Sequence, residues 1–352
     1  MYDVEGIRLR ASYAEGILNA DLGRAFVGTG FVRMLTGLLY TVTGPSLLGA
    51  FFVFSWLGFW GLYLCYRAFC LAVPEGDRYR YALLVLLLPS LLFWPSSLGK
   101  EALITLGLGA LAYGAARVLT GQRLGFAIAL AGLLLTGAVR PHVAAMAAVG
   151  LVAAYFTRRQ PAGASITAPL AKLFGLLVLG GILVVAVGQT QSLLGVDSFN
   201  TEAVQEARAT VVDRTNQGGS SFENAETDLD PSKFHVAVAS VLFRPFPWEA
   251  SNLQSFIAAL EGLFLLSLFV VGWRRLLGAF RSLVRTPYVM LCLTYSVLFI
   301  YGFSSFTNFG ILTRQRVQVL PFIVVLVCLP PFRGGRRDLR ELLLSSEPVR
   351  AR

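Results

Sequence analysis

Residues 48–69 read LGAFFVFSWLGFWGLYLCYRAF, and this stretch holds a single charged residue, Arg67. An α-helix crosses the hydrocarbon core of a bilayer in about 20 residues, so the stretch has the length and composition of a membrane span. Of the 352 residues, 55% are hydrophobic and only 14% are charged, whereas soluble domains carry about 25% charged residues. The apolar runs do not alternate with polar residues as the strands of a membrane barrel do. We therefore predict an all-α, polytopic membrane helix bundle.

The same criterion, applied to the whole chain, predicts nine transmembrane helices. They lie at about residues 47–72, 81–94, 101–119, 124–139, 142–157, 170–189, 253–272, 287–303 and 317–332. The domain organisation that follows is an outer loop over 1–46, six spans over 47–189, an extracytoplasmic loop over 190–252, three spans over 253–332 and a basic tail over 333–352. Residues 24–42 within the first loop predict an amphipathic or re-entrant helix, and residues 201–212 predict a short helix in the second.

The basic residues divide unequally between the two sets of loops. One set holds 18 of the 30 Lys and Arg residues and five acidic residues. The positive-inside rule places that set in the cytoplasm, which predicts an outer N-terminus and a cytoplasmic C-terminus. The same rule accounts for the net charge of +10 without nucleic acid as a partner. An outer N-terminus without a signal sequence leads us to expect either a further helix before Met1 or a start of translation upstream of it.

Several common functional signatures are absent from the sequence. The four cysteines fall in apolar runs without metal-ligand spacing, and no GxSxG or zinc-protease motif occurs. Gly99 and Lys100 do not form a P-loop, because Trp94 stands at the first glycine position and Glu101 at the Ser/Thr position. The sequence therefore calls for no metal and no cofactor.

The stretch FWPSSLGKEALI (93–104) places Lys100 and Glu101 side by side between two apolar spans. One interpretation is a capped helix start with a solvated ion pair, because Ser96 or Ser97 can cap the helix and Glu101 lies in its first turn. The alternative is a functional site, because the other outer turns also carry cations. The residues concerned are Arg140 and His142 in VRPHVAA, Arg244 and Glu249 in LFRPFPWEASN, and Asn308, Arg314 and Arg316 in TNFGILTRQRVQVLPF.

Each arginine alone could lie at the lipid headgroups with its stem in the bilayer. Four short turns that all carry a cation favour a shared site instead, and a guanidinium group suits phosphate or carboxylate. Asp3 and Glu5 add carboxylates on the same predicted side. A carboxylate or histidine among cations is the arrangement expected for a substrate with a phosphate leaving group.

The blocks PSLLFWPSSLGKEAL, GAVRPHVAA, LFRPFPWEASNLQ with LEGL, and NFGILTRQRVQVLPF resemble a bacterial family of multi-pass membrane proteins linked with surface-polysaccharide assembly. In plan the chain is similar to EpsG-like and O-antigen-polymerase-like proteins and, more distantly, to GT-C glycosyltransferases. The resemblance implies a polyprenyl-linked sugar donor and acceptor, which the protein would meet at the outer face of the cytoplasmic membrane. It also implies two further partners, the lipid bilayer and polysaccharide assembly proteins.

The resemblance also implies roles for individual residues. Asp3, with Glu5 as the alternative, matches the acidic base of the first outer loop in GT-C enzymes, and Glu101 is a second candidate base. Lys100, Arg140, Arg244, Arg314 and Arg316 would bind the substrate phosphate, supported by His142, Glu249 and Asn308. Two other functions stay open: a transporter or flippase of a lipid-linked or anionic substrate, and a non-catalytic assembly scaffold.

The sequence alone predicts that Arg316→Ala and Arg244→Ala each abolish polymer formation while the protein still inserts into the membrane, because each would lose a phosphate contact. Assay of surface polymer together with membrane fractionation checks this. Normal polymer in both variants would contradict it.

Overall fold

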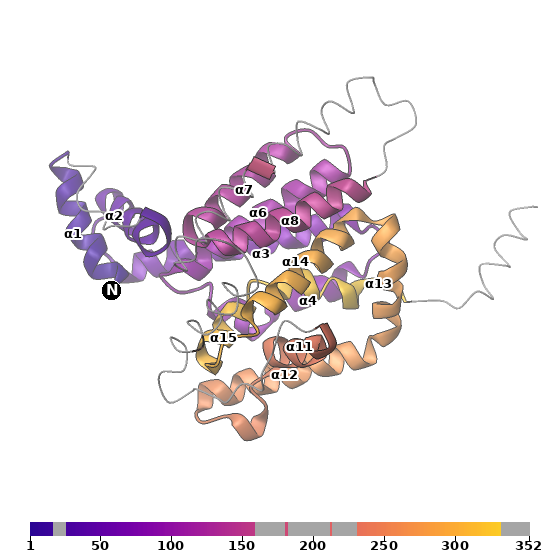
Figure 1. The fold of residues 1–352 in the computed structure, drawn as a ribbon. Coiled ribbons are helices and arrows are strands. Elements are labelled where there is room, and N and C mark those ends of the chain that lie inside the picture. Colours follow the sequence, from indigo (N-terminus) through magenta and orange to yellow (C-terminus); the bar gives the residue numbers. More distant parts are fainter. Residues whose placement is uncertain (17–25, 159–179, 182–211, 213–230, 332–352) are drawn as a thin grey trace, which may run out of the picture.

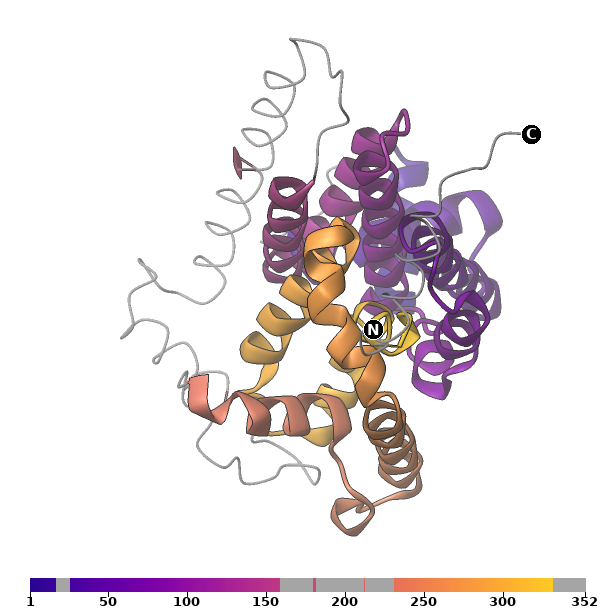
Figure 2. The ribbon, with the colours of Figure 1, turned by 90° about the vertical axis from the view of Figure 1, so that its right-hand side faces the viewer.

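A computed structural model gives the fold of residues 1–16, 26–158, 180–181, 212 and 231–331 (Figure 1). Every regular element in these residues is a helix. Helices α3 (Leu47–Ala72), α6 (Lys100–Leu119), α7 (Gly125–Val139) and α8 (Pro141–Thr157) pack side by side. Helix α14 (Pro287–Phe303) lies between this group and the pair formed by α11 (Phe234–Phe243) and α12 (Leu253–Val271), as Figures 1 and 2 show.

The structure confirms the all-helical class but not the nine spans. Among the described residues, α3, α6 and α12 are long and apolar enough to cross a membrane. Helix α15 (Phe309–Arg316) and the following segment Leu320–Cys328, which are bent by 54° from one another, would together make a fourth. Several apolar helices thus fit a membrane protein, with three or four candidate crossings.

The other predicted spans are shorter or broken. Helices α7, α8 and α14 coincide with predicted spans but have 15 to 17 residues. Segment 81–94 divides into α4 (Arg78–Leu87) and α5 (Pro89–Phe93), because Pro89 has no N–H to donate and its ring disfavours a helical Leu88. Within the described part of segment 317–332, which ends at residue 331, the helical elements are α16 (Leu320–Ile323) and the 3-10 turn η4 (Leu326–Cys328). The span predicted at 170–189 and the helix at 201–212 lie outside the described residues, apart from 180–181 and 212.

Four helices were not predicted from the sequence: α15, which lies in the predicted last outer turn, and the three described next. Helix α1 (Tyr2–Ala14) pairs with α2 (Phe31–Thr43), which corresponds to the amphipathic segment predicted over 24–42 and follows the short π-helical turn η1 (Phe26–Gly30). Helix α11 follows the 3-10 turn η2 (Pro231–Lys233) inside the predicted 190–252 loop, and a further 3-10 turn, η3 (Pro247–Glu249), precedes α12. Helix α13 (Trp273–Arg285) connects α12 to α14. These helices do not meet the criterion for a membrane span, because they are too short or too polar.

Glycines allow the backbones of α3, α6 and α7 to touch. A Cβ atom on Gly61 of α3 would lie 2.3 Å from the carbonyl oxygen of Thr105, and one on Gly109 of α6 would lie 2.1 Å from that of Gly61. On the other side of α6, a Cβ on Gly114 would lie 2.2 Å from the backbone nitrogen of Ala129 in α7. Close approach through small residues is how helices associate where lipid replaces water.

This packing gives the bundle two chemically different ends. At one end Arg67 approaches the ring of Tyr113, and Arg117 donates to the carbonyl oxygen of Arg123. At the other end Lys100 begins α6, and Arg140 lies between α7 and α8. The two sets of loops predicted from the sequence thus lie at opposite ends of these helices. Which of the two ends faces the cytoplasm stays a prediction.

Gly61→Ala should lower the free energy of unfolding by about 2 kcal/mol, because the added methyl group meets backbone atoms that cannot move aside. Gly137→Ala in α7 is the matched control: its Cβ would meet only the Cβ of Ala144, at 3.6 Å, so it should be neutral or stabilise by up to ~1 kcal/mol. Thermal unfolding in the same detergent measures both. Equal stability of the two variants would contradict the glycine contact.

Candidate functional site

Segments far apart in the sequence meet at one cavity of about 530 Å³. Its cationic side chains come from the start of α6, the α7–α8 turn and the end of α15: they are Lys100, Arg140 and Arg314. Amide side chains and aromatic rings complete the wall. They belong to Asn252, Gln254, Asn308 and Gln315, and to Tyr2, Trp94 and Phe309. The cations predicted at three of the four outer turns therefore line a single cavity.

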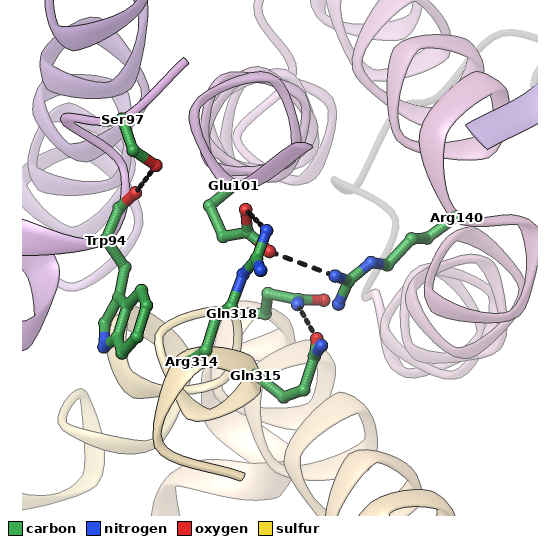
Figure 3. A network of polar contacts seen from close by, with 7 residues as sticks. All are labelled: Trp94, Ser97, Glu101, Arg140, Arg314, Gln315 and Gln318. Carbon is green, nitrogen blue, oxygen red and sulfur yellow. Dashed lines mark hydrogen bonds and ion pairs between the residues drawn. The ribbon is translucent and has the colours of Figure 1, made fainter. Parts of the chain in front are cut away.

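The carboxylate of Glu101 fixes two of these cations. Its side chain is 0% exposed. Arg140 Nη2 donates to Oε1 at 3.1 Å, and Arg314 Nη2 donates to Oε2 at 2.6 Å (Figure 3). Both oxygens are thus engaged, each by a different arginine. A buried carboxylate with both oxygens paired in this way holds its partners in defined positions.

The local backbone explains why these residues converge. Gly99 is fully extended and precedes the first turn of α6, so Lys100 and Glu101 begin the helix together. Arg140 is also extended, and Pro141 at the first position of α8 suits the start of a new helix. Asn308 caps α15 by accepting from the backbone N–H groups of Gly310 and Ile311. Each cation therefore lies at a helix boundary, where the chain changes direction.

The charged side chains in and beside the cavity are predominantly positive. Lys100 experiences repulsion from Arg140 and Arg314, and also from Arg33 of α2, and attraction from Glu101. Burial raises the pKa of the Tyr2 phenol, so Tyr2 is a neutral hydrogen-bonding group at neutral pH. Among the described lining residues there is no carboxylate. Such a cavity attracts an anion.

Two arginines predicted to bind phosphate do not line the cavity. Arg316 is 1% exposed, and its Nη1 donates to the carbonyl oxygens of Leu242 at 2.7 Å and Arg244 at 3.1 Å. It thereby stabilises the C-terminus of α11, as a cation does at that end of a helix. Arg244 forms a bidentate pair with Glu249 and lies 5.1 Å from the centre of the Phe309 ring. These residues support the wall of the cavity from behind.

The remaining sequence candidates lie in three different settings. Asp3 accepts a hydrogen bond from Tyr40 between α1 and α2 and is not among the lining residues. His142 follows Arg140 by two residues and lies 6.0 Å, centre to centre, from the ring of Phe303. Asn308 lines the cavity, although its side-chain oxygen is engaged in capping α15. The catalytic and supporting roles predicted for these residues stay predictions.

Sequence reasoning missed several polar residues around the site. Tyr2 and Gln315 line the cavity, and Gln315 accepts a hydrogen bond from Gln318 at 2.6 Å (Figure 3). Glu261 in α12 is buried and accepts from the backbone N–H of Ser90 at 2.8 Å. An acidic residue inside an apolar span is a recognisable signal, because a charge there needs a partner. The glutamines carry no comparable signal.

No family model, no curated protein and no solved structure matches this chain. Among the described residues, no three His, Cys, Asp or Glu side chains come close enough together to hold a metal ion.

Removing the Glu101 carboxylate should destabilise the protein by about 3 kcal/mol, because Arg140 and Arg314 are then left near each other without a counter-charge. Glu101→Ala is the variant, and unfolding in detergent is the measurement. Glu249→Ala removes the carboxylate of the partly exposed Arg244–Glu249 pair and should lower the free energy of unfolding by less. A Glu101 variant as stable as the wild type would contradict the role given to the buried pair.

Proposed function

We propose that the protein binds the phosphate group of a lipid-linked sugar in this cavity and transfers that sugar to an acceptor hydroxyl. It would act as a membrane glycosyltransferase or polysaccharide polymerase at the outer face of a bacterial cytoplasmic membrane. The observation that carries the proposal is the convergence of Lys100, Arg140 and Arg314 on one cavity. The cations come from three separate helix boundaries, and headgroup anchoring alone does not require them to meet.

A phosphate or diphosphate group is the ligand that these cations suit best. Arginine presents a planar fork of donors to phosphate oxygens, and lysine adds a mobile point charge. Because Glu101 already holds Arg140 and Arg314 in place, little ordering of these side chains accompanies binding. Preorganised donors of this kind also stabilise charge that develops on a departing phosphate.

The surface beside the cavity favours a ligand with an apolar chain. Asn252, Gln254 and Ser255 line the cavity at the start of α12, whereas Leu253 between them is 75% exposed. Further along α12, Ile257 and other large apolar side chains are also exposed. In a membrane this face of α12 contacts lipid chains, so an isoprenoid chain attached to the phosphate has an apolar surface directly at the edge of the cavity.

The amides and rings of the cavity suit a sugar. Asn252, Gln254 and Gln315 offer both donors and acceptors to hydroxyl groups. Trp94 and Phe309 provide apolar ring surface, which suits the C–H face of a pyranose. The combination of fixed cations, amides and aromatic rings matches a sugar phosphate better than it matches either a simple anion or a hydrocarbon.

The proposed transfer is a substitution at the anomeric carbon. The acceptor oxygen forms a bond to that carbon, the bond from the carbon to the phosphate oxygen breaks, and the phosphate leaves with the electron pair. Arg140, Arg314 and Lys100 stabilise the negative charge on the leaving phosphate. The acceptor proton passes to a base; Asp3, the candidate from the sequence, accepts from Tyr40 outside the lining and would have to turn toward the cavity to take it. Glu101 is better suited to positioning the arginines, because both of its oxygens are occupied.

Arg314→Ala and Lys100→Ala should each reduce polymer or glycolipid formation by at least about 100-fold, because each removes a donor to the leaving phosphate. The measurement is product formation in cells that depend on the variant gene, at matched protein level in the membrane. Arg67→Ala is the control, since Arg67 is exposed at the opposite end of the bundle and contacts Tyr63.

Transfer measured in a detergent extract, added to product formation in cells, separates the alternatives. A transporter or flippase would lose movement of the lipid-linked sugar across the membrane without losing transfer in a detergent extract. A scaffold would tolerate both substitutions. Wild-type product from Arg314→Ala and Lys100→Ala would therefore overturn the proposed transfer.

A further inference from the structure

Helix α13 carries a second concentration of positive charge, which neither the cavity nor the proposed transfer uses. Its sequence, WRRLLGAFRSLVR, contains four arginines and no acidic residue. It is also the most amphipathic of the helices that the structure describes. A basic amphipathic helix is typical of segments that lie along a membrane surface.

One face of α13 is fixed to the rest of the protein. Ala279 is buried, and Leu276 and Leu283 pack against the core. Arg275 donates to the carbonyl oxygen of Leu329 at 2.8 Å and lies 3.5 Å from the carboxylate of Asp77, the residue that caps α4. These contacts determine which side of α13 faces outward.

The opposite face exposes apolar and cationic side chains together. Trp273 is 54% exposed and Leu277 is 45% exposed. The guanidinium carbon of Arg274, which is also exposed, lies 5.6 Å from the centre of the Trp273 ring. Tryptophan is enriched at the boundary between lipid chains and water. Val271 at the end of α12 is exposed as well, so the apolar surface of α12 continues into this face.

The path of the chain orients α13 along the membrane surface. It joins the end of α12 to the start of α14, and Figure 1 shows it crossing between these two helices instead of extending α12. Thirteen residues of helix span about 20 Å. Through Asp77 and α4 it lies at the same end of the bundle as Arg67 and Arg117. This is the end that the distribution of charges assigns to the cytoplasm.

We propose that α13 lies in the headgroup layer and binds the anionic phospholipids of the membrane surface through Arg274. The apolar side chains Trp273 and Leu277 would insert among the upper parts of the lipid chains, while the guanidinium group of Arg274 contacts phosphate. Both contributions, buried apolar surface and attraction to anionic lipid, strengthen the binding of such helices. The proposal does not depend on the proposed sugar transfer, because it uses different residues at the other end of the molecule.

The experiment compares the full chain in nanodiscs of phosphatidylcholine with the full chain in nanodiscs containing increasing phosphatidylglycerol. The unfolding temperature of the wild type should rise with the phosphatidylglycerol fraction, because a ligand that binds only the folded state stabilises it. The variant R274Q should lose at least about half of that rise, because the cation beside Trp273 on the exposed face is gone. About 0.5 M NaCl should weaken the effect by screening.

Two controls separate this lipid site from general charge effects and from misfolding. R274K keeps the charge and should keep most of the rise. R10Q removes an exposed arginine from α1, at the other end of the molecule, and should keep all of it. Native mass spectrometry of R274Q should show less retained phosphatidylglycerol than the wild type. A full rise in R274Q, no rise in the wild type, or an equal loss in R10Q would each overturn the proposal. If a soluble protein or a second copy of this chain, and not lipid, raises the unfolding temperature, the proposal is overturned too.

Discussion

The site depends on one buried carboxylate. Glu101 holds Arg140 through one oxygen and Arg314 through the other, and without it two guanidinium groups from different helices would repel each other inside the protein. Removing charges from water carries a large penalty, which is offset only when geometry and hydrogen bonding are both good. Glu101 meets this requirement at the first turn of α6, where the helix dipole also favours an anion. The positions of the cations in the cavity therefore follow from this residue.

The glycine contacts determine where that carboxylate lies. Helix α6 touches the backbone of α3 on one side and of α7 on the other, so the start of α6 is held next to the end of α7. The α7–α8 turn then places Arg140 beside Glu101. From the other group of helices, Asn308 caps α15 and Arg316 anchors that helix to the end of α11. Close packing thus brings residues 101, 140 and 314 to one point.

The sequence predicted these features where the signal was local. Apolar runs bounded by polar or proline-containing turns located α3 and α6 to within one residue, and the repeated cations at the outer turns indicated a shared site. The role of each arginine could not be predicted from the sequence. Arg314 and Arg316 are two residues apart, so on a helix they point in nearly opposite directions. One lines the cavity and the other binds backbone carbonyls, and composition alone cannot distinguish them.

The same limit applies to the acidic residues and to the short helices. Tyr2 lines the cavity while its neighbour Asp3 bonds to Tyr40, because successive residues on α1 point about 100° apart. Glu101 was expected to be either a solvated partner or a base, whereas the structure buries it between two arginines. Helix α11 was missed because its ten residues are fewer than a span requires. The burial of Glu101 and the different contacts of Tyr2 and Asp3 depend on tertiary packing, which cannot be predicted from a single sequence.

Arg140 and Arg314, held by Glu101, and the neighbouring Lys100 form the proposed binding site for a phosphate attached to an apolar chain. The most direct measurement is an experimental structure of the full chain in lipid, determined with a short-chain isoprenoid phosphate. Density for the phosphate should lie within hydrogen-bonding distance of Lys100 and Arg314, with the chain leaving along α12. A phosphate bound only elsewhere on the protein, or a cavity that stays empty at saturating ligand, would contradict it.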